Sequence, residues 1–287
     1  MNARDRFVLP DIQSQPDTRD IGIAAVGVKR VRYPVTLLIG ERLVPTIATL
    51  SMTVGLSANA KGTHMSRFLE ILELQAEPLS QGRFRIMTID MLERLNAHSG
   101  TIEMRFPHFV RKAAPISGVQ SHLDYDVRWR GTVAPDGAYS FWMRVTVPAT
   151  SLCPCSKAIS DYGAHNQRSH IVVDAQIEGE MAVEEVIAIA ERSASCEVYG
   201  LLKRSDEKYV TERAYDNPKF VEDLVRDVAV TLNGERRVLA YTVEAENFES
   251  IHNHSAFARV VRRSPSTKLG HFRSTHTWVS PVEDVIV

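Results

Sequence analysis

The sequence predicts an α+β protein made of two modules, each with two strands, a helical stretch and two more strands. Apolar residues alternate along several segments, as they do in half-buried strands. In other segments they recur every three or four residues, as they do on the buried face of a helix. This order of segments occurs twice along the chain. The short links between neighbouring strands favour antiparallel sheets, with helices covering one face of each.

The first module is expected over residues 21–137, after a flexible polar arm over residues 1–20. From Val44 to Leu56 the apolar residues share one parity, which predicts a strand, and the preceding Ile-Gly-Glu-Arg suits a hairpin turn. From His64 the apolar period changes to three and four residues, which predicts a helix. In order, the expected elements are strands over 26–37 and 44–56, helices over 64–75 and 87–97, and strands over 102–106 and 123–133.

The second module is expected over residues 138–265, with a C-terminal tail over 266–287. Asp216 suits the N-cap of a helix whose apolar stripe begins at Phe220 and ends at Leu232. In order, the expected elements are strands over 139–147 and 171–177, helices over 182–192 and 216–233, and strands over 236–246 and 256–263.

Charge and composition narrow the function classes. The formal net charge of -1 over 287 residues argues against a nucleic-acid binder, because no basic excess is present to neutralise a phosphate backbone. The first twenty residues lack the apolar core of a signal peptide, and the longest apolar runs are too short to span a bilayer, so no membrane association is expected. Three cysteines, two of them one residue apart, do not make a disulfide framework. We therefore expect a reduced cytoplasmic protein.

The segment from Ser151 to His170 is expected to be a long polar loop between two strands, where functional residues often lie. It contains Cys153, Cys155 and His165, and thiolates and imidazoles are natural ligands of zinc and similar divalent ions. The residues alone leave an alternative open, which is a loop with incidental cysteines and solvent-facing histidines. Thiol redox chemistry is disfavoured, because one residue rather than two separates the cysteines.

A second group of polar residues lies between the last two predicted strands. Glu249, His252 and His254 offer a carboxylate and two imidazoles suited to proton transfer near neutral pH. The alternative is a polar turn whose charges face water.

Two further segments could contact a nucleotide. Glu207 could complete a metal shell, and Glu222, beside an apolar helix stripe, could accept two hydrogen bonds from a guanine edge. The alternative for Glu222 is an ordinary exposed glutamate. Lys61-Gly-Thr-His-Met-Ser-Arg67 precedes a predicted helix and suits a phosphate group, although the spacing of a Walker loop is absent.

Four motifs stand in order along the chain. They are Lys61-Gly-Thr-His-Met-Ser-Arg-Phe68, Cys153-Pro-Cys-Ser-Lys-Ala-Ile-Ser-Asp-Tyr-Gly-Ala-His-Asn-Gln-Arg-Ser169, Leu201-Leu-Lys-Arg-Ser-Asp-Glu-Lys-Tyr-Val210 and Glu246-Asn-Phe-Glu-Ser-Ile-His-Asn-His254. Together they resemble the type IB family of GTP cyclohydrolase I, over residues 20–265. The resemblance implies the tunnelling fold (T-fold), with two modules in one chain, and a homotetramer with active sites at subunit interfaces.

The resemblance also implies a reaction and its residues. GTP would be hydrolysed to formate and 7,8-dihydroneopterin triphosphate, with a divalent metal ion (zinc, manganese or iron) activating the water that attacks C8 of the purine. Cys153, His165 and Glu207 match metal ligands, and Cys155 is either a further ligand or a partner of one. The remaining implied roles are catalysis beside the metal for Cys153, Glu249 and His252, guanine anchoring for Glu222, and triphosphate contacts, in the same or a neighbouring subunit, for Arg168, Ser169, Lys61 and Arg67.

Two rival functions remain open. One is another T-fold enzyme acting on a purine or pterin, which formate release would distinguish. The other is a non-catalytic, metal-stabilised nucleotide-binding protein, which a closed shell of protein ligands would support. Ser205 departs from the proline expected at that position, but it lies in an expected loop and does not change the predicted function.

Overall fold

The strands of the structure lie side by side in one antiparallel sheet. The structure is a computed structural model and describes residues 11–263. Over that range nine strands pair in the order β1-β2-β3-β4-β5-β6-β8-β9, with the short β7 beside β5. Their bounds are β1 (Ile23–Ile39), β2 (Arg42–Leu56), β3 (Gly100–Ala113), β4 (Gln120–Val133), β5 (Tyr139–Leu152), β6 (Asn166–Ile177), β7 (Cys196–Glu197), β8 (Val238–Asn247) and β9 (Ala256–Arg262). Pairing of β4 with β5 joins the two predicted modules.

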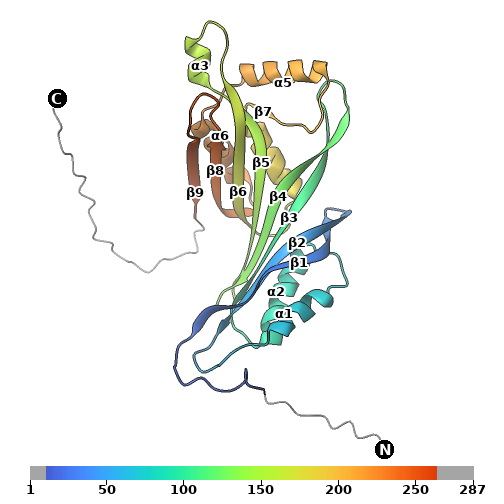
Figure 1. The fold of residues 1–287 in the computed structure, drawn as a ribbon, viewed down its shortest axis with the longest axis vertical. Helices are drawn as coiled ribbons and strands as arrows, with labels where there is room; N and C mark the ends of the chain where they lie inside the picture. Colours follow the sequence, from blue (N-terminus) through green and yellow to red (C-terminus); the bar gives the residue numbers. More distant parts are fainter. Residues whose placement is uncertain (1–10, 264–287) are drawn as a thin grey trace, which may run out of the picture.

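Helices cover the sheet in two groups (Figure 1). In the described residues they are α1 (Met65–Glu73), α2 (Gln81–Leu95), α3 (Pro154–Ile159), α4 (Val183–Ser193), α5 (Arg204–Asp216) and α6 (Val221–Gly234). The first group, α1 and α2, packs on the first half of the sheet, and α4 and α6 pack on the second half. The α+β class is therefore confirmed. Across residues 11–263, no helix combines the length and the apolar character needed to cross a bilayer.

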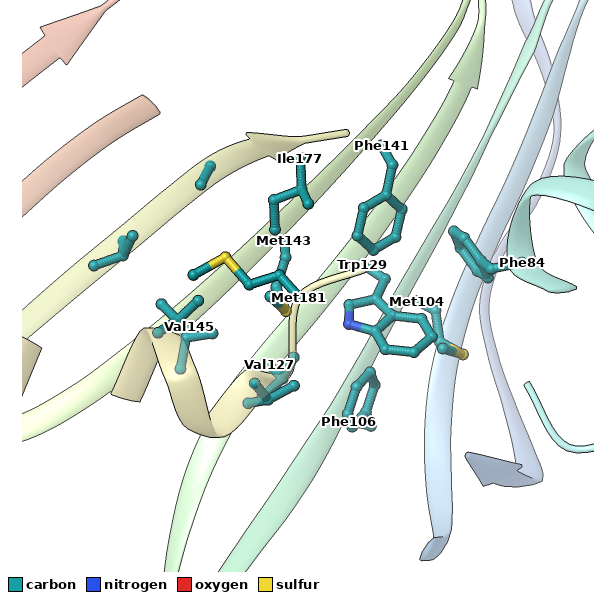
Figure 2. Close-up of a cluster of buried hydrophobic side chains, with 14 of the residues drawn as sticks. Phe84, Met104, Phe106, Val127, Trp129, Phe141, Met143, Val145, Ile177 and Met181 are labelled. Carbon is teal, nitrogen blue, oxygen red and sulfur yellow. The ribbon is translucent and has the colours of Figure 1, made fainter. Parts of the chain in front are cut away.

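One continuous core joins the two halves, with Trp129 of β4 near its centre (Figure 2). The rings of Phe84, Phe106 and Phe141 meet the Trp129 indole edge to face, with centroids 5.5–5.8 Å away. That arrangement places the positive edge of one ring on the negative face of another. Met181, which precedes α4, packs into the same cluster. The two modules therefore share a core as well as a sheet.

Alternation predicted the strands well. Along β2 the residues from Ala48 to Val54 are buried at every second position, as the shared parity requires. The predicted hairpin is confirmed, because Ile39 pairs with Arg42 across a two-residue turn. Gly40 in that turn has φ of +59°, a conformation that glycine adopts without steric cost.

Three predictions about helices were wrong in detail. The helix expected from residue 87 begins at Gln81, where the Ser80 hydroxyl caps it by accepting a hydrogen bond from the Arg83 backbone N–H. The segment from Arg204 was expected to be a loop and forms α5. Asp216 is the last residue of α5 rather than an N-cap, and α6 begins five residues later.

The two ends of the chain were predicted to be an arm and a tail. Residues 1–10 of the arm and the whole tail, 266–287, lie outside the described residues. Within the rest of the arm, the Gln13 amide donates to the Thr63 carbonyl, and the Asp17 backbone N–H donates to the Asn59 carbonyl. Residues 13–17 thus lie along the connection between β2 and α1.

Candidate active site

Strand ends bring Cys153, His165 and Glu249 together. Leu152 and Asn166 are paired across β5 and β6, so the residues that follow and precede them stand opposite each other. The Cys153 backbone N–H donates to the His165 carbonyl over 3.0 Å. Glu249 follows the end of β8, the next strand in the sheet, and its Oε2 lies 3.6 Å from His165 Nδ1. The His165 imidazole and the Glu249 carboxylate therefore meet at one end of the sheet, and Cys153 adjoins His165 through its backbone.

Cys153 is the N-cap of the short helix α3, which corrects the prediction of a loop throughout this segment. Pro154 occupies the first helical position, where its missing N–H costs no hydrogen bond. The Cys153 Sγ accepts a hydrogen bond from the Ser156 backbone N–H at 3.4 Å. The Ser156 hydroxyl accepts from the His165 backbone N–H at 3.2 Å, which ties the helix to the start of β6. Cys153 is half-buried, whereas Cys155 is exposed.

His165 is held mainly on its Nδ1 side. Its Nδ1 lies 2.7 Å from Oε1 of Gln167, a residue that the sequence analysis did not single out. The side chains of His165 and Glu249 are each 12% exposed, so both face the interior of the strand junction rather than open solvent. The sequence could not single out Gln167 as a functional residue, because a polar residue is ordinary in a segment that is expected to be a polar loop.

A buried polar network lies beneath these side chains. The Asn247 amide donates to the Ser151 hydroxyl at 3.2 Å and accepts from the Ser169 hydroxyl at 2.6 Å. Ser151 in turn donates to the Lys219 carbonyl at 2.8 Å. The three side chains are at most 3% exposed. Ser169 was predicted to contact a triphosphate, but in this chain its buried hydroxyl binds the amide of Asn247.

The same network positions the start of α6, which carries Glu222. The Lys219 backbone N–H donates to the Leu152 carbonyl at 3.1 Å, so the turn before α6 is fixed to the residue preceding Cys153. Glu222 lies in the first turn of α6 and is exposed. The predicted guanine anchor and the predicted metal ligand Cys153 therefore stand near the same end of the sheet.

Glu207 does not join this group within one chain. It is exposed in the first turn of α5. The other end of α5 contacts α3, where the Lys157 ammonium lies over the Tyr215 ring. Eight residues of helix place Glu207 about 12 Å from Tyr215 along the axis. Over residues 11–263, no three His, Cys, Asp or Glu side chains are close enough to hold a metal ion.

The neighbouring Asp206 explains why α5 begins where it does. Its carboxylate is fully buried and accepts hydrogen bonds from the backbone N–H groups of Ile116, Ser117 and Lys203 and from the Ser117 hydroxyl. Burial opposes ionisation, but these hydrogen bonds outweigh it and hold the pKa of Asp206 well below its usual range. Asp206 therefore fixes the start of α5 to the turn between β3 and β4.

Lys61, in the connection from β2 to α1, and Arg67, in α1, lie at the opposite end of the molecule from Cys153. Figure 1 shows the connection from β2 to α1 at the lower end of the long axis and α3 at the upper end. The Lys61 ammonium binds Oε1 of Gln15 at 3.1 Å, and Arg67 donates to the Arg94 carbonyl at 3.0 Å. A single chain therefore does not bring these two predicted phosphate contacts to the strand ends.

The remaining predicted residues surround the candidate site. His252 and His254 are exposed in the loop after β8, with their rings stacked at 5.1 Å between centroids. Arg168 is also exposed, and its carbonyl accepts a hydrogen bond from the Phe248 backbone N–H at 3.0 Å. That bond ties the start of this loop to β6.

Comparison with known proteins identifies close relatives of this chain. Residues 9–258 match the family model described as "Type I GTP cyclohydrolase folE2". The protein named GTP cyclohydrolase FolE2 of Paraburkholderia xenovorans is 60% identical over 257 residues, which cover 89% of this chain and 96% of the relative. The protein of the same name in Cupriavidus necator is 58% identical over 256 residues, with the same coverage.

Solved structures with a similar fold come from a different group of enzymes. Uricase from Arthrobacter globiformis matches with a TM-score of 0.51 at 8% identity, covering 86% of this chain and 96% of the uricase. A highly active mutant of urate oxidase from Bacillus sp. TB-90 also has a TM-score of 0.51, at 9% identity, covering 84% and 99%. At such low identity the likeness shows the fold alone, and it confirms the predicted tunnelling fold.

Proposed function

The chain belongs to the FolE2 family of type I GTP cyclohydrolases, and from this premise we propose that it hydrolyses GTP to formate and 7,8-dihydroneopterin triphosphate with the help of a divalent metal ion. It is an enzyme, and its reaction is the first step of folate-type pterin synthesis. The two rival functions are not favoured, because the family model and its curated relatives carry one name over most of the chain.

One observation supports this chemistry most directly: Cys153 and His165 are joined by a backbone hydrogen bond, and the His165 imidazole lies 3.6 Å from the Glu249 carboxylate. Sulfur, nitrogen and oxygen donors of this kind suit zinc, manganese or iron. Cys153 and His165 fit as ligands of such an ion, with Glu207 and Cys155 as further candidates. When bound, the ion would activate water and stabilise the charge that develops on the attacked purine.

The chain's own side chains would supply binding and proton transfer. Glu222, exposed at the start of α6, can accept two hydrogen bonds from the N–H groups of a guanine edge. Attack at C8 and opening of the ring need protons moved onto and off nitrogen and oxygen atoms. Glu249 and His252 would move them, since a carboxylate and an imidazole can both act in general acid–base catalysis.

We also propose a homotetramer in which neighbouring chains complete each site. Within residues 11–263 the metal-ligand set of one chain is incomplete, and Lys61 and Arg67 lie far from Cys153. Large apolar side chains are exposed near the strand ends, with Ile159 at 84% and Ile251 at 64%. Contact with a neighbouring chain there would remove these apolar side chains from water. A neighbouring chain could therefore bring phosphate contacts or a ligand such as Glu207 to the site.

Formate release tests the proposed function. Protein stripped with a chelator would be given GTP and, separately, zinc, manganese or ferrous iron. We expect formate with at least one ion, together with a pterin that becomes fluorescent on oxidation. Tight binding of GTP without formate under every ion would instead support a nucleotide-binding protein. From its three free cysteines we further propose a cytoplasmic location for the enzyme.

A further inference from the structure

Gln167 places an oxygen atom beside the imidazole of His165. The Gln167 Oε1 lies 2.7 Å from His165 Nδ1, and the Glu249 Oε2 lies 3.6 Å from the same nitrogen. Gln167 is 7% exposed, and its backbone pairs with Ser151 of β5. The sheet therefore fixes the Gln167 backbone, and Nδ1 of His165 faces oxygen atoms supplied by both β6 and the loop after β8.

These oxygens favour one tautomer of His165. A neutral imidazole carries a proton on one ring nitrogen and a lone pair on the other. An ionised carboxylate can only accept hydrogen bonds, and the amide oxygen of Gln167 also accepts. With a proton on Nδ1, the ring can donate a hydrogen bond to these oxygens. A lone pair on Nδ1 would instead face acceptor oxygens and be repelled by them. The proton therefore belongs on Nδ1, which leaves the lone pair on Nε2.

From this geometry we propose that Gln167 is a positioning residue that holds His165 as its Nδ1–H tautomer and so presents Nε2 to a divalent metal ion. The tautomer follows from the contacts of His165, and only the identity of the ligand rests on the proposed function. In metal sites the ring nitrogen that does not bind the metal commonly donates to an oxygen, and loss of that oxygen weakens metal binding about 10- to 100-fold.

Nitrogen NMR of metal-free, full-length protein labelled with ¹⁵N-histidine tests the tautomer directly. At pH 8.5, about two units above the ordinary imidazole pKa, histidine is neutral and its two nitrogens give distinct signals. The His165 signals are identified by their loss in His165→Asn. We expect Nδ1–H in the wild type and in Gln167→Glu, which keeps an acceptor oxygen. We expect the Nε2–H form to appear in Gln167→Met, which has a similar shape and no acceptor.

Two results would overturn the proposal. One is an Nε2–H tautomer in the wild type, which needs no variant to be observed. The other is an unchanged tautomer in Gln167→Met, which would assign the orienting role to Glu249. Gln176→Met serves as the matched control, because Gln176 lies on the same strand but pairs with Trp142, away from His165.

Zinc affinity, measured by competition with a chromogenic chelator, provides the second readout. We expect Gln167→Met to bind zinc about 10- to 100-fold more weakly than the wild type, and Gln176→Met to match the wild type. Equal zinc affinity in Gln167→Met and the wild type would contradict the positioning role. Because neither measurement uses GTP, the tautomer can be confirmed even if no formate is released. Formate release with an unchanged Gln167→Met tautomer would confirm the enzyme function and reject this inference.

Discussion

The Asn247 amide binds the Ser151 hydroxyl, so the end of β8 is joined to the end of β5 across the intervening strand β6. The amide oxygen of Asn247 simultaneously accepts from Ser169 of β6. One buried side chain thus connects three strands at the end of the sheet that carries Cys153, His165 and Glu249. Through Ser151 and the Lys219 carbonyl, the connection reaches the turn that precedes Glu222.

Replacing Asn247 with alanine should weaken both the fold and the binding of GTP. The hydroxyls of Ser151 and Ser169 would be left buried with a lost partner, which costs about 1–3 kcal/mol. The turn before α6 would be held less firmly, so KM for GTP should rise more than kcat falls. Urea unfolding and steady-state kinetics measure the two effects. Asn59→Ala, at an exposed residue, is the control, and equal stability of both variants would contradict the role of the network.

Cys153→Ala should abolish turnover while leaving the oligomer folded. The thiol is a proposed metal ligand, so its loss should reduce formate release by more than about 100-fold. That exceeds the effect of losing a residue that only hydrogen-bonds to a metal ligand. Cys153 is only half-buried, and its removal should not disturb the core. Formate assays and size-exclusion chromatography check the two expectations. Normal turnover in purified Cys153→Ala would remove the central claim, and Cys196→Ala controls for loss of any thiol.

Much of the fold could be predicted from the sequence, because most strands alternate and most helices have an apolar stripe. Helix α5 could not, since its buried residues are Asp206 and Ala214 and it has no apolar stripe. It is held instead by hydrogen bonds from the distant turn at Ile116 and Ser117.

The candidate site could be predicted in part. Cys153 and His165 flank a loop between neighbouring strands, so their proximity follows from antiparallel pairing. Gln167 and Asn247 could not be singled out, because their importance depends on which side chains the strands bring beside them. The separation of Lys61 from Cys153 likewise depends on the length and direction of the whole sheet (Figure 1).

Glu222→Gln should chiefly weaken GTP binding. A carboxylate can accept two hydrogen bonds from the guanine N–H groups, and a hydrogen bond to a charged group contributes about 1.5–3 kcal/mol, or roughly 10- to 150-fold in affinity. Glu222 is exposed, so stability should hardly change. Binding of GTP to metal-free protein, measured by calorimetry, checks the affinity. Glu212→Gln, an exposed position on α5, is the control, and an unchanged affinity in Glu222→Gln would reject the anchoring role.

Cys196 should make the protein less stable at alkaline pH. Burial raises the pKa of this thiol from its ordinary value of 9.0 to about 11, and the neighbouring Glu197 carboxylate acts in the same direction. The folded state therefore retains a proton that the unfolded state releases between these two values. The stabilisation is fully present below pH 9 and is lost as the pH rises to 11, by up to about 3 kcal/mol.

Urea unfolding of the wild type and Cys196→Ala between pH 7 and 11 isolates the effect, since other groups titrate in both. We expect the stability difference to be constant up to about pH 9 and then to shift against the wild type. A difference that stayed constant to pH 11 would show that the buried thiol does not contribute to alkaline unfolding.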